Sequence, residues 1–580
     1  MQGVEGSGRE LWDAGEVVGH LVAEGSMFAF LVAHRVRVFP DEQYADLFSP
    51  VGRPSLPATR MAAVLTLQAL HELSDRECAE AVRCDLRWKV ACGLSLLDEG
   101  FDPSTLVYWR RRIADSVRPH RVNDAVRQVI EATGVLGGRR RRAVDSTILD
   151  DAVATQDTIT QLIAAIRRVG RQVPGAAAVI AAECCGHDYS APGKPRIDWT
   201  DPEAKNALVS ALVNDANAVL AALTETGTET DTETDEVAAA ALALLALVAG
   251  QDVEPAPGSD GRDGRWRIAR KVAPDRVIST VDPQARHTRK SQRSRRDGYR
   301  AHLVAEPGTG LITDEALTMA AGPDNADPAL AQQFLAHTEQ GQDEQGQDEQ
   351  GQDEQGVVAV SDGSGDAGLA ATSAEADTSD ADTSDAAGGS GGQEQGMTWY
   401  GDSAYGTGEL RDAIERAGDR AVIKPKPVAP AVAGGFTLDD FTVDEQTATM
   451  TCPAGWTRPL SPGRRVTFGA LCRDCPLRAR CTTATAGRSI TLHEHDQRLR
   501  SARAEWAADP ALREEYRRQR PNVERTVSQV ASHRGRRVKL RYRGTVKNNA
   551  WLKRRTAGLN LRNLIGRGLT RHTGTWVLAT

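Results

Sequence analysis

A long acidic segment of low sequence complexity divides the chain and limits what it can fold into. Residues 339–394 begin with repeats of EQGQD, continue with Ser, Asp, Gly, Ala and Thr, and contain 15 Asp or Glu and no Lys or Arg. Such a segment has too little apolar surface to offset the entropy lost on ordering. We therefore expect residues 339–396 to be a disordered acidic insertion, and the folded core to come from the chain on either side.

The negative net charge of the chain comes from this acidic segment, and the remaining residues are basic overall. The formal net charge of the 580 residues is −8, and it becomes +7 without those 15 acidic residues. Residues 511–572 hold 18 Lys or Arg against 3 Asp or Glu, and residues 286–300 form a second basic cluster. Segregated positive charge predicts a surface that meets nucleic-acid phosphates, whereas a solvated helix face is the ordinary alternative for a single basic run.

Hydropathy and cysteine usage favour the cytoplasm. The apolar run Val237–Gly250 is too short to span a bilayer, and the N-terminal residues do not resemble a signal peptide. Nine cysteines in a cytoplasmic protein indicate free thiols or a metal site rather than a disulfide framework. We expect a cytoplasmic protein that does not associate with membranes.

Residues 1–138 predict a helical N-terminal domain. Ser74 and Glu77 have the spacing of a capping box, and a second short helical segment follows at residues 85–92. Two short helices over residues 74–92 suggest a helix-turn-helix that docks in a DNA groove, and an ordinary helical hairpin is an equal alternative. The basic residues expected to be exposed there, and to contact DNA, are Arg76, Arg83, Arg87 and Lys89.

The remaining chain predicts a mixed α/β core with insertions. From residue 139 the order is a strand, a strand hairpin, a helix, a strand, a helix and a strand, with a late helix near the C-terminus. This order matches a ribonuclease H-like mixed sheet flanked by helices. The expected parts are the first core segment 139–338 with a helical insertion at 150–270, the second core segment 397–427, a cysteine-containing insertion at 428–510, and a C-terminal catalytic helix and basic tail at 511–580.

Three acidic residues stand in settings suited to a metal site. Asp145 and Asp402 each end a short apolar run rich in β-formers, which places them at strand tips, and Glu524 lies in a basic segment that reads as helical. Carboxylates are the ligands that Mg²⁺ prefers, and two ions about 3.5 to 4 Å apart can hold both the attacking and the leaving oxygen of a phosphodiester. The pattern indicates DNA strand cutting and joining.

The ordered set of motifs resembles the DDE-type transposases of bacterial insertion sequences, which have a ribonuclease H-like catalytic domain. The motifs are SPVGRPSLPATRMAAVLTLQALHELSDRECAEAVRCDLRWKVACGL, DPSTLVYWRRRI, VDST, GDSAYG, YRRQRPNVER, RYRGTVKNN and LNLRNL. The resemblance covers most of the chain outside the low-complexity insertions. Tyr516 and Arg520 suit the tyrosine and arginine that many relatives carry before the glutamate, but no lysine follows it within residues 525–537.

The resemblance implies a catalytic triad of Asp145, Asp402 and Glu524 with Mg²⁺ or Mn²⁺ as cofactor. Water would cut the phosphodiester at the element's end, and the released 3′-hydroxyl would then attack target DNA. The partners would be double-stranded DNA, as terminal inverted repeats and target, and a second copy of the chain, at the nucleoid. The expected DNA contacts in the C-terminal segment are Arg517, Arg520, Arg534, Arg536 and Arg537. The alternatives are a DNA-binding remnant or regulator without catalysis, and a nuclease that only hydrolyses.

Four cysteines cluster between the last core strand and the Glu524 segment. They are Cys452, Cys472, Cys475 and Cys481. A C-x₂-C pair with two further cysteines can build a tetrahedral zinc site, and a set of reduced, partly buried thiols is the alternative. If zinc binds, it would stabilise an insertion that otherwise has a small apolar core.

Overall fold

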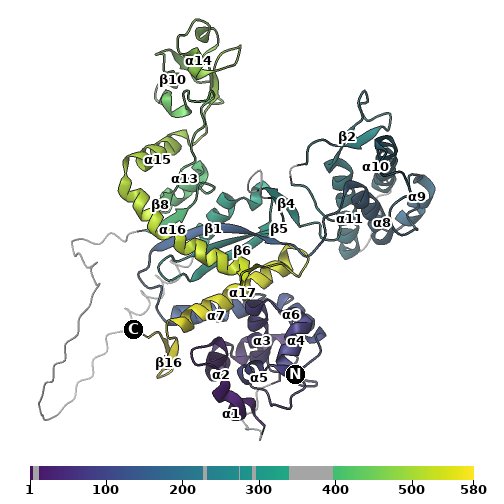
Figure 1. Cartoon of the computed structure of the whole chain (residues 1–580), viewed down its shortest axis with the longest axis vertical. Coiled ribbons are helices and arrows are strands. Elements are labelled where there is room, and N and C mark those ends of the chain that lie inside the picture. Colours follow the sequence, from purple (N-terminus) through teal and green to yellow (C-terminus); the bar gives the residue numbers. More distant parts are fainter. Residues whose placement is uncertain (4–11, 226–231, 274, 290–294, 339–395, 580) are drawn as a thin grey trace, which may run out of the picture.

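The computed structural model describes residues 1–3, 12–225, 232–273, 275–289, 295–338 and 396–579. A central sheet lies in the middle of the molecule, with the N-terminal helices below it, a helical insertion to one side and a small unit of short strands at the top (Figure 1). The structure is thus a mixed α/β fold with two inserted units. The expected acidic insertion at 339–396 lies, except for residue 396, outside the described residues.

The central sheet has the order β4-β5-β1-β7-β8, and β6 also pairs with β5. β5 runs antiparallel to both β1 and β6, whereas β1, β7 and β8 run parallel. The predicted hairpin and the later strand, helix and strand are confirmed. The bounds are β1 (Arg141–Asp150), β4 (Arg286–Arg289), β5 (Arg295–Ala305), β6 (Ile312–Met319), β7 (Thr398–Gly401) and β8 (Arg420–Ile423).

Helices cover both faces of this sheet. Val144 and Trp399 point to the face covered by the helix over residues 327–338 and by α13 (Gly408–Arg416). Ala143 and Tyr400, one position away on the same strands, point to the opposite face, which α16 and α17 cover. Because side chains alternate along a strand, Asp145 and Asp402 share the face of Ala143 and Tyr400.

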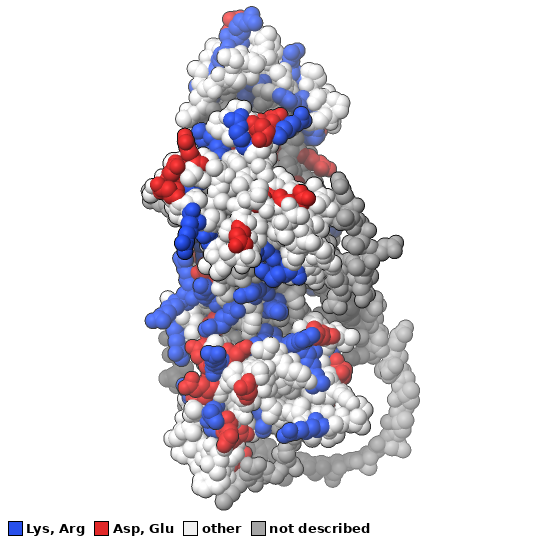
Figure 2. Space-filling model, turned by 90° about the vertical axis from the view of Figure 1, so that its right-hand side faces the viewer, with Lys and Arg blue, Asp and Glu red and all other residues white. Residues whose placement is uncertain are grey.

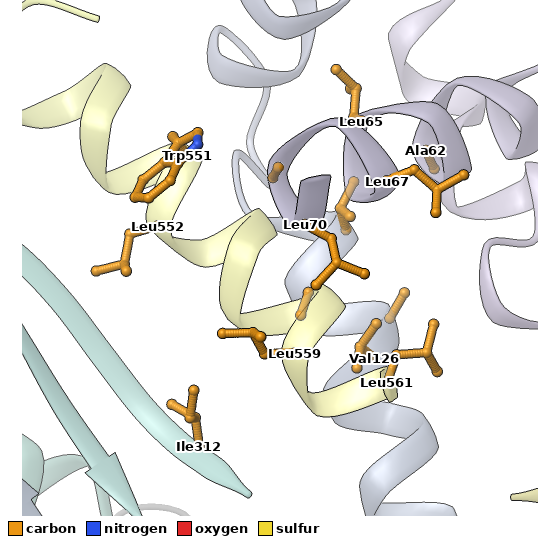
Figure 3. Packing of buried hydrophobic residues seen from close by; sticks show 14 of the residues in the cluster. Ala62, Leu65, Leu67, Leu70, Val126, Ile312, Trp551, Leu552, Leu559 and Leu561 are labelled. Atoms are coloured by element: carbon orange, nitrogen blue, oxygen red, sulfur yellow. The ribbon is translucent and has the colours of Figure 1, made fainter. Parts of the chain in front are cut away.

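The N-terminal residues fold around one buried helix, α3 (Ala58–His71), and dock on the sheet through α17 (Thr545–Gly566). Every residue from Ala58 to Leu70 except Arg60 is buried, and Leu70 lies between α3 and α17, which carries Leu559 (Figure 3). The other helices are α1 (Ala14–Val18), α2 (Met27–Val38), α4 (Asp75–Cys84), α5 (Leu86–Ala91), α6 (Ser104–Ala114) and α7 (Arg121–Ala132), with 3₁₀ turns at Gly19–Leu21 and Asp41–Leu47.

The insertion after β1 has a core of its own. It contains α8 (Thr158–Gln172), α9 (Ala176–Glu183), α10 (Pro202–Glu225) and α11 (Thr232–Gln251), followed by the hairpin β2 (Val253–Pro255) and β3 (Trp266–Ile268). Pro202–Leu223 of α10 is long and apolar enough to cross a membrane by length and composition. It packs against α8, α9 and α11, with Val209 and Leu212 fully buried, and so forms the centre of this helical unit.

A small unit of short strands precedes the last long helices. Its own core is built around Phe441, Met450 and Phe468. Its elements are β9 (Thr442–Asp444), β10 (Thr449–Thr451), β11 (Thr457–Pro459), β12 (Arg465–Thr467), α14 (Arg478–Cys481) and β13 (Ser489–Thr491), with 3₁₀ turns at Leu438–Asp440 and Gly469–Cys472. We call residues 436–492 the cysteine unit.

The chain after the cysteine unit returns to the sheet. α15 (Asp496–Ala508), which the sequence assigned to the insertion, contacts α13 and α16 (Pro510–Ala531). A short hairpin, β14 (Ser532–His533) and β15 (Arg536–Arg537), then leads into α17. The last elements are β16 (Thr570–His572) and β17 (Thr575–Val577). A further 3₁₀ turn, Pro323–Asn325, precedes the helix over residues 327–338.

Candidate active site

Asp145 and Asp402 lie side by side on neighbouring parallel strands. The register of β1 and β7 pairs Arg141 with Thr398 and Ala143 with Tyr400, and its continuation places Asp145 opposite Asp402. Asp402 follows the last residue of β7, as the sequence predicted. Asp145 is not at a strand tip: it lies in the middle of β1, because β1 continues to Asp150 by pairing with β5 on its other edge.

Helix α16 brings Glu524 to the same place, together with Arg520 one turn before it. The Arg520 Nη2 atom lies 2.7 Å from Asp145 Oδ2 and 3.9 Å from Asp402 Oδ2, and its Nε atom lies 3.4 Å from Glu524 Oε1. The Arg520 Nη1 group also donates to the Val144 carbonyl at 3.2 Å. Three carboxylates from segments far apart in the sequence therefore converge on one guanidinium.

The three carboxylates differ in solvent exposure, and therefore in how strongly water screens their charges. Asp145 is 13% exposed, Asp402 43% and Glu524 61%. Burial raises the pKa of Asp145, while Arg520 and the backbone N–H of Ser146 offset part of that rise. Burial is the largest single influence and lowers the pKa of Arg520, but Asp145, Tyr516 and Asp402 together outweigh it, so the net pKa is raised. Asp145 and Arg520 thus form the buried end of the cluster.

Aromatic rings border the cluster on two sides. Tyr516, one turn before Arg520, packs edge-to-face on Trp506 at 5.2 Å between ring centroids. Burial raises the pKa of Tyr516, so its phenol stays neutral. Tyr405 is 2% exposed in the core beneath the sheet, which supports a packing role.

A second polar cluster, which the sequence did not indicate, lies beneath the sheet. Asp327 begins the helix over residues 327–338, and its Oδ1 atom lies 3.1 Å from Arg300 Nη1 and 3.5 Å from His302 Nδ1. His302 pairs with Ser146 in the β1–β5 register, and its Nε2 atom contacts the Thr318 hydroxyl at 3.1 Å. Burial lowers the pKa of His302 to about 4. Only the position of an acidic residue at a helix start could have signalled this cluster.

The side chains around Arg520 could serve as ligands for Mg²⁺ or Mn²⁺, because Asp145, Asp402 and Glu524 offer carboxylate oxygens, which these ions prefer. Within the described residues, however, no group of three or more His, Cys, Asp or Glu side chains is spaced to hold a metal ion. In this structure the three carboxylates surround the Arg520 guanidinium instead.

The four clustered cysteines line one cavity in the cysteine unit. Cys452, Cys472, Cys475 and Cys481 surround a space of about 20 Å³, which is room for about one water molecule. All four are free thiols, and the backbone N–H of Arg488 donates to the Cys472 sulfur at 3.4 Å. Burial raises the pKa of Cys481. The structure thus brings together the four residues that the sequence grouped, although their sulfur atoms do not already have the spacing of a metal site.

The predicted helix-turn-helix is not observed. α4 has the expected capping box, but Asp85 alone separates it from α5, whereas a helix-turn-helix uses a turn of three or four residues. Lys89 was expected to be exposed and is instead 4% exposed, with its amino group donating to the Asp98 carbonyl. Residues 74–92 are a pair of short helices, and the Lys89 amino group points into the protein rather than toward solvent.

The other basic residues expected to contact DNA are mostly exposed. Arg76, Arg83 and Arg87 are exposed on α4 and α5, although Arg87 also pairs with Asp85 at 2.6 Å. Arg517 is exposed on α16, and Arg534, Arg536 and Arg537 are exposed on the β14–β15 hairpin. Lys and Arg side chains gather in a band across the middle of the face in Figure 2, at the height of the central sheet. Arg520 differs from these residues because it is engaged by the carboxylates.

Comparisons with known proteins find two segments of the chain that are similar to transposase families. Residues 28–112, from α2 into α6, match the family "Transposase domain (DUF772)". Residues 451–565, which include α16 and Glu524, match the family "Transposase DDE domain". Both matches support the assignment of the chain as an insertion-sequence DDE transposase. Its resemblance to that family, first seen in the motifs, is confirmed.

One curated relative is similar to part of the chain. It is the uncharacterized protein ORF8 in the nfe locus of Rhizobium meliloti, which is 30% identical over 121 residues. The match covers 20% of the chain and 56% of the relative, so the chain spans about half the length of that relative. No solved structure matches the chain.

Proposed function

We propose that this chain is a metal-dependent DNA transposase that cuts the ends of its insertion sequence and joins the 3′-hydroxyls to target DNA. The observation that carries the proposal is the convergence of Asp145, Asp402 and Glu524 on one cation in a chain with two transposase domains. The strand order, with β1 central between an antiparallel hairpin and two parallel strands, supports a ribonuclease H-like core.

The carboxylates would hold Mg²⁺ or Mn²⁺, which supplies charge neutralisation at the scissile phosphate and activates the attacking oxygen. Asp145 and Asp402 lie in register, so the sheet fixes the distance between them before any substrate binds. Glu524 is the most exposed of the three, which leaves its carboxylate open to solvent. Tyr516 would form a wall that orients the DNA end beside them.

DNA would bind along the basic surface that borders this cluster. The proposed phosphate contacts are Arg76, Arg83 and Arg87 at the N-terminal helices, Arg517 on α16 and Arg534, Arg536 and Arg537 on the hairpin after it. Each neutralised phosphate contributes about 0.9 to the log–log salt slope. Two element ends must be held together, so we infer that the protein acts as at least a dimer, at the nucleoid in the cytoplasm.

The cysteine unit would bind one Zn²⁺ through Cys452, Cys472, Cys475 and Cys481. Their common cavity supports this inference, and so does the small core of the unit, which a metal would reinforce. Elemental analysis of the purified chain tests it: one zinc per chain is expected, and none in a variant with Ser at all four positions. Purified chain that holds no zinc would favour reduced thiols that only pack.

The catalytic proposal is tested by strand transfer with a labelled element-end duplex, a plasmid target and Mg²⁺. Wild type is compared with Asp145→Asn, Asp402→Asn and Glu524→Gln, and with Glu514→Gln, which changes an exposed acidic residue on the same helix. Joining by wild type and Glu514→Gln alone supports the transposase. Binding without cutting in wild type would favour a DNA-binding remnant or regulator, and cutting without joining would favour a nuclease that only hydrolyses.

A further inference from the structure

Arg520 occupies the centre of the carboxylate cluster with its whole guanidinium. Its side chain is 11% exposed, and each of its three nitrogen atoms faces an oxygen atom: the carboxylates of Asp145, Asp402 and Glu524 and the carbonyl of Val144. Arg520 therefore neutralises part of the negative charge of the cluster and reduces the repulsion between its three carboxylates. A residue that reached out to solvent for DNA would not have this environment.

The same oxygen atoms cannot serve Arg520 and a divalent cation together. Mg²⁺ needs oxygen ligands at about 2.0 to 2.1 Å in near-octahedral geometry. Arg520 Nη2 already lies 2.7 Å from Asp145 Oδ2 and 3.9 Å from Asp402 Oδ2. A guanidinium this close would repel a second cation, and the low exposure of Asp145 weakens screening by water. Loading a metal ion requires Arg520 to withdraw.

DNA offers Arg520 another anion. The guanidinium fork matches phosphate oxygens as well as carboxylate oxygens. Arg517 and Arg525 are exposed on the same helix and would draw a phosphate backbone toward it. Pro521 follows Arg520 inside α16, and because proline lacks a backbone N–H, the helical bond to the Arg517 carbonyl is missing at this point. The helix is thus least constrained where Arg520 would have to move.

We propose that Arg520 is a built-in counter-ion that keeps the carboxylates closed to divalent cations until DNA phosphate draws it away. DNA binding and metal binding then strengthen each other, because each favours the state in which Arg520 has left the carboxylates. Metal ions bind weakly to the chain without DNA, which restricts cutting to assembled complexes. This inference rests on the proposed function, and it makes Arg520 a positioning residue that acts through the carboxylates.

The direct test measures Mn²⁺ affinity of the full chain without DNA, from the electron paramagnetic resonance signal of free Mn²⁺. Arg520→Gln should bind Mn²⁺ about tenfold more tightly than wild type, because the competing charge is gone. Arg518→Gln, a matched change at an exposed position of the same helix, should leave the affinity unchanged. Asp145→Asn in the Arg520→Gln background should lose the tighter binding, which assigns it to this cluster. Equal or weaker Mn²⁺ binding by Arg520→Gln overturns the proposal.

A second measurement covers the case in which Arg520→Gln does not fold. Arg520→Lys keeps the charge but loses the fork, and should bind Mn²⁺ with intermediate affinity; affinity no higher than that of wild type overturns the proposal. A duplex carrying the element end should also tighten Mn²⁺ binding to wild type by a larger factor than to either variant. Equal factors overturn the coupling. If Mn²⁺ binding behaves as expected but strand transfer never occurs, the proposed function fails and the role of Arg520 stands.

Discussion

The carboxylate cluster and the cysteine unit are two candidate metal sites built on opposite plans. Asp145, Asp402 and Glu524 come from three segments spread over most of the chain, and they are fixed by a sheet and a long helix. The four cysteines come from 30 residues and line a small cavity between short strands. The first site is held together by an internal cation, whereas the second depends on a small apolar core. A metal ion should therefore do chemistry in the first and support folding in the second.

The largest expected effect is on the strand-transfer rate, which should depend on the carboxylate cluster and not on the cysteine unit. Asp145→Asn should lower the strand-transfer rate by more than about a hundredfold, because it removes a ligand of the reacting centre while keeping the side-chain volume. Cys475→Ser should leave the single-turnover rate within a few-fold of wild type. Similar losses in both variants would mean that the cysteine unit also takes part in catalysis.

Acidification should weaken the sheet that carries the carboxylates. His302 beneath β1 has its pKa lowered to about 4 in the folded protein, against about 6.5 when unfolded. The unfolded chain therefore binds more protons below pH 6.5, and stability falls as the pH drops from 7 toward 4. The loss at pH 5 is about 2 kcal/mol from this residue. Thermal unfolding at pH 7 and pH 5 should show a smaller difference in His302→Gln; the same difference in both proteins would refute the assignment.

Zinc removal should loosen the cysteine unit alone. In Cys475→Ser we expect amide hydrogen exchange over residues 436–492 to rise by about tenfold, because the unit loses a stabilising ligand and has only a small core. Exchange in α3 and β1 should not change. The control is Cys84→Ser, an exposed thiol on α4. If exchange also rose in the sheet, the two regions would be coupled rather than independent.

The smallest effect concerns DNA affinity. Arg536→Gln, on the hairpin that follows α16, should reduce the log–log salt slope by about 0.9, which weakens binding about threefold at moderate salt. Arg473→Gln, an exposed change in the cysteine unit, should leave the slope unchanged. Fluorescence anisotropy over a range of salt concentrations measures both. A slope that depends on Arg473 but not on Arg536 would move the DNA path to the cysteine unit.

The sequence predicted the elements better than their environments. The predicted order of elements correctly included the β5–β6 hairpin and the later strands β7 and β8. The burial of Lys89 escaped prediction because a long amphipathic side chain fits an exposed position as readily as a buried one with carbonyl partners. Asp145 was placed at a strand tip because the sequence does not show that β5 extends the pairing of β1.

The sequence was enough to name the residues of the candidate site, but not to predict how they are arranged. Motif resemblance singled out Asp145, Asp402 and Glu524, and cysteine spacing grouped the four thiols. Arg520 was expected only as a DNA contact, because its position one turn from Glu524 does not reveal which strand carboxylates α16 faces. The sheet register and the packing of α16 on β1 supply that information, and both depend on contacts between distant segments.

The parallel register of β1 and β7 also bears on how such a chain can change in evolution. Neighbouring strands are about 4.8 Å apart whatever the length of chain that connects them. The helical unit and residues 339–395 all lie between Asp145 and Asp402 in sequence, and the spacing of the two carboxylates is independent of their size. New modules, natural or engineered as reporters, can therefore be spliced between these strands while the reacting centre keeps its dimensions.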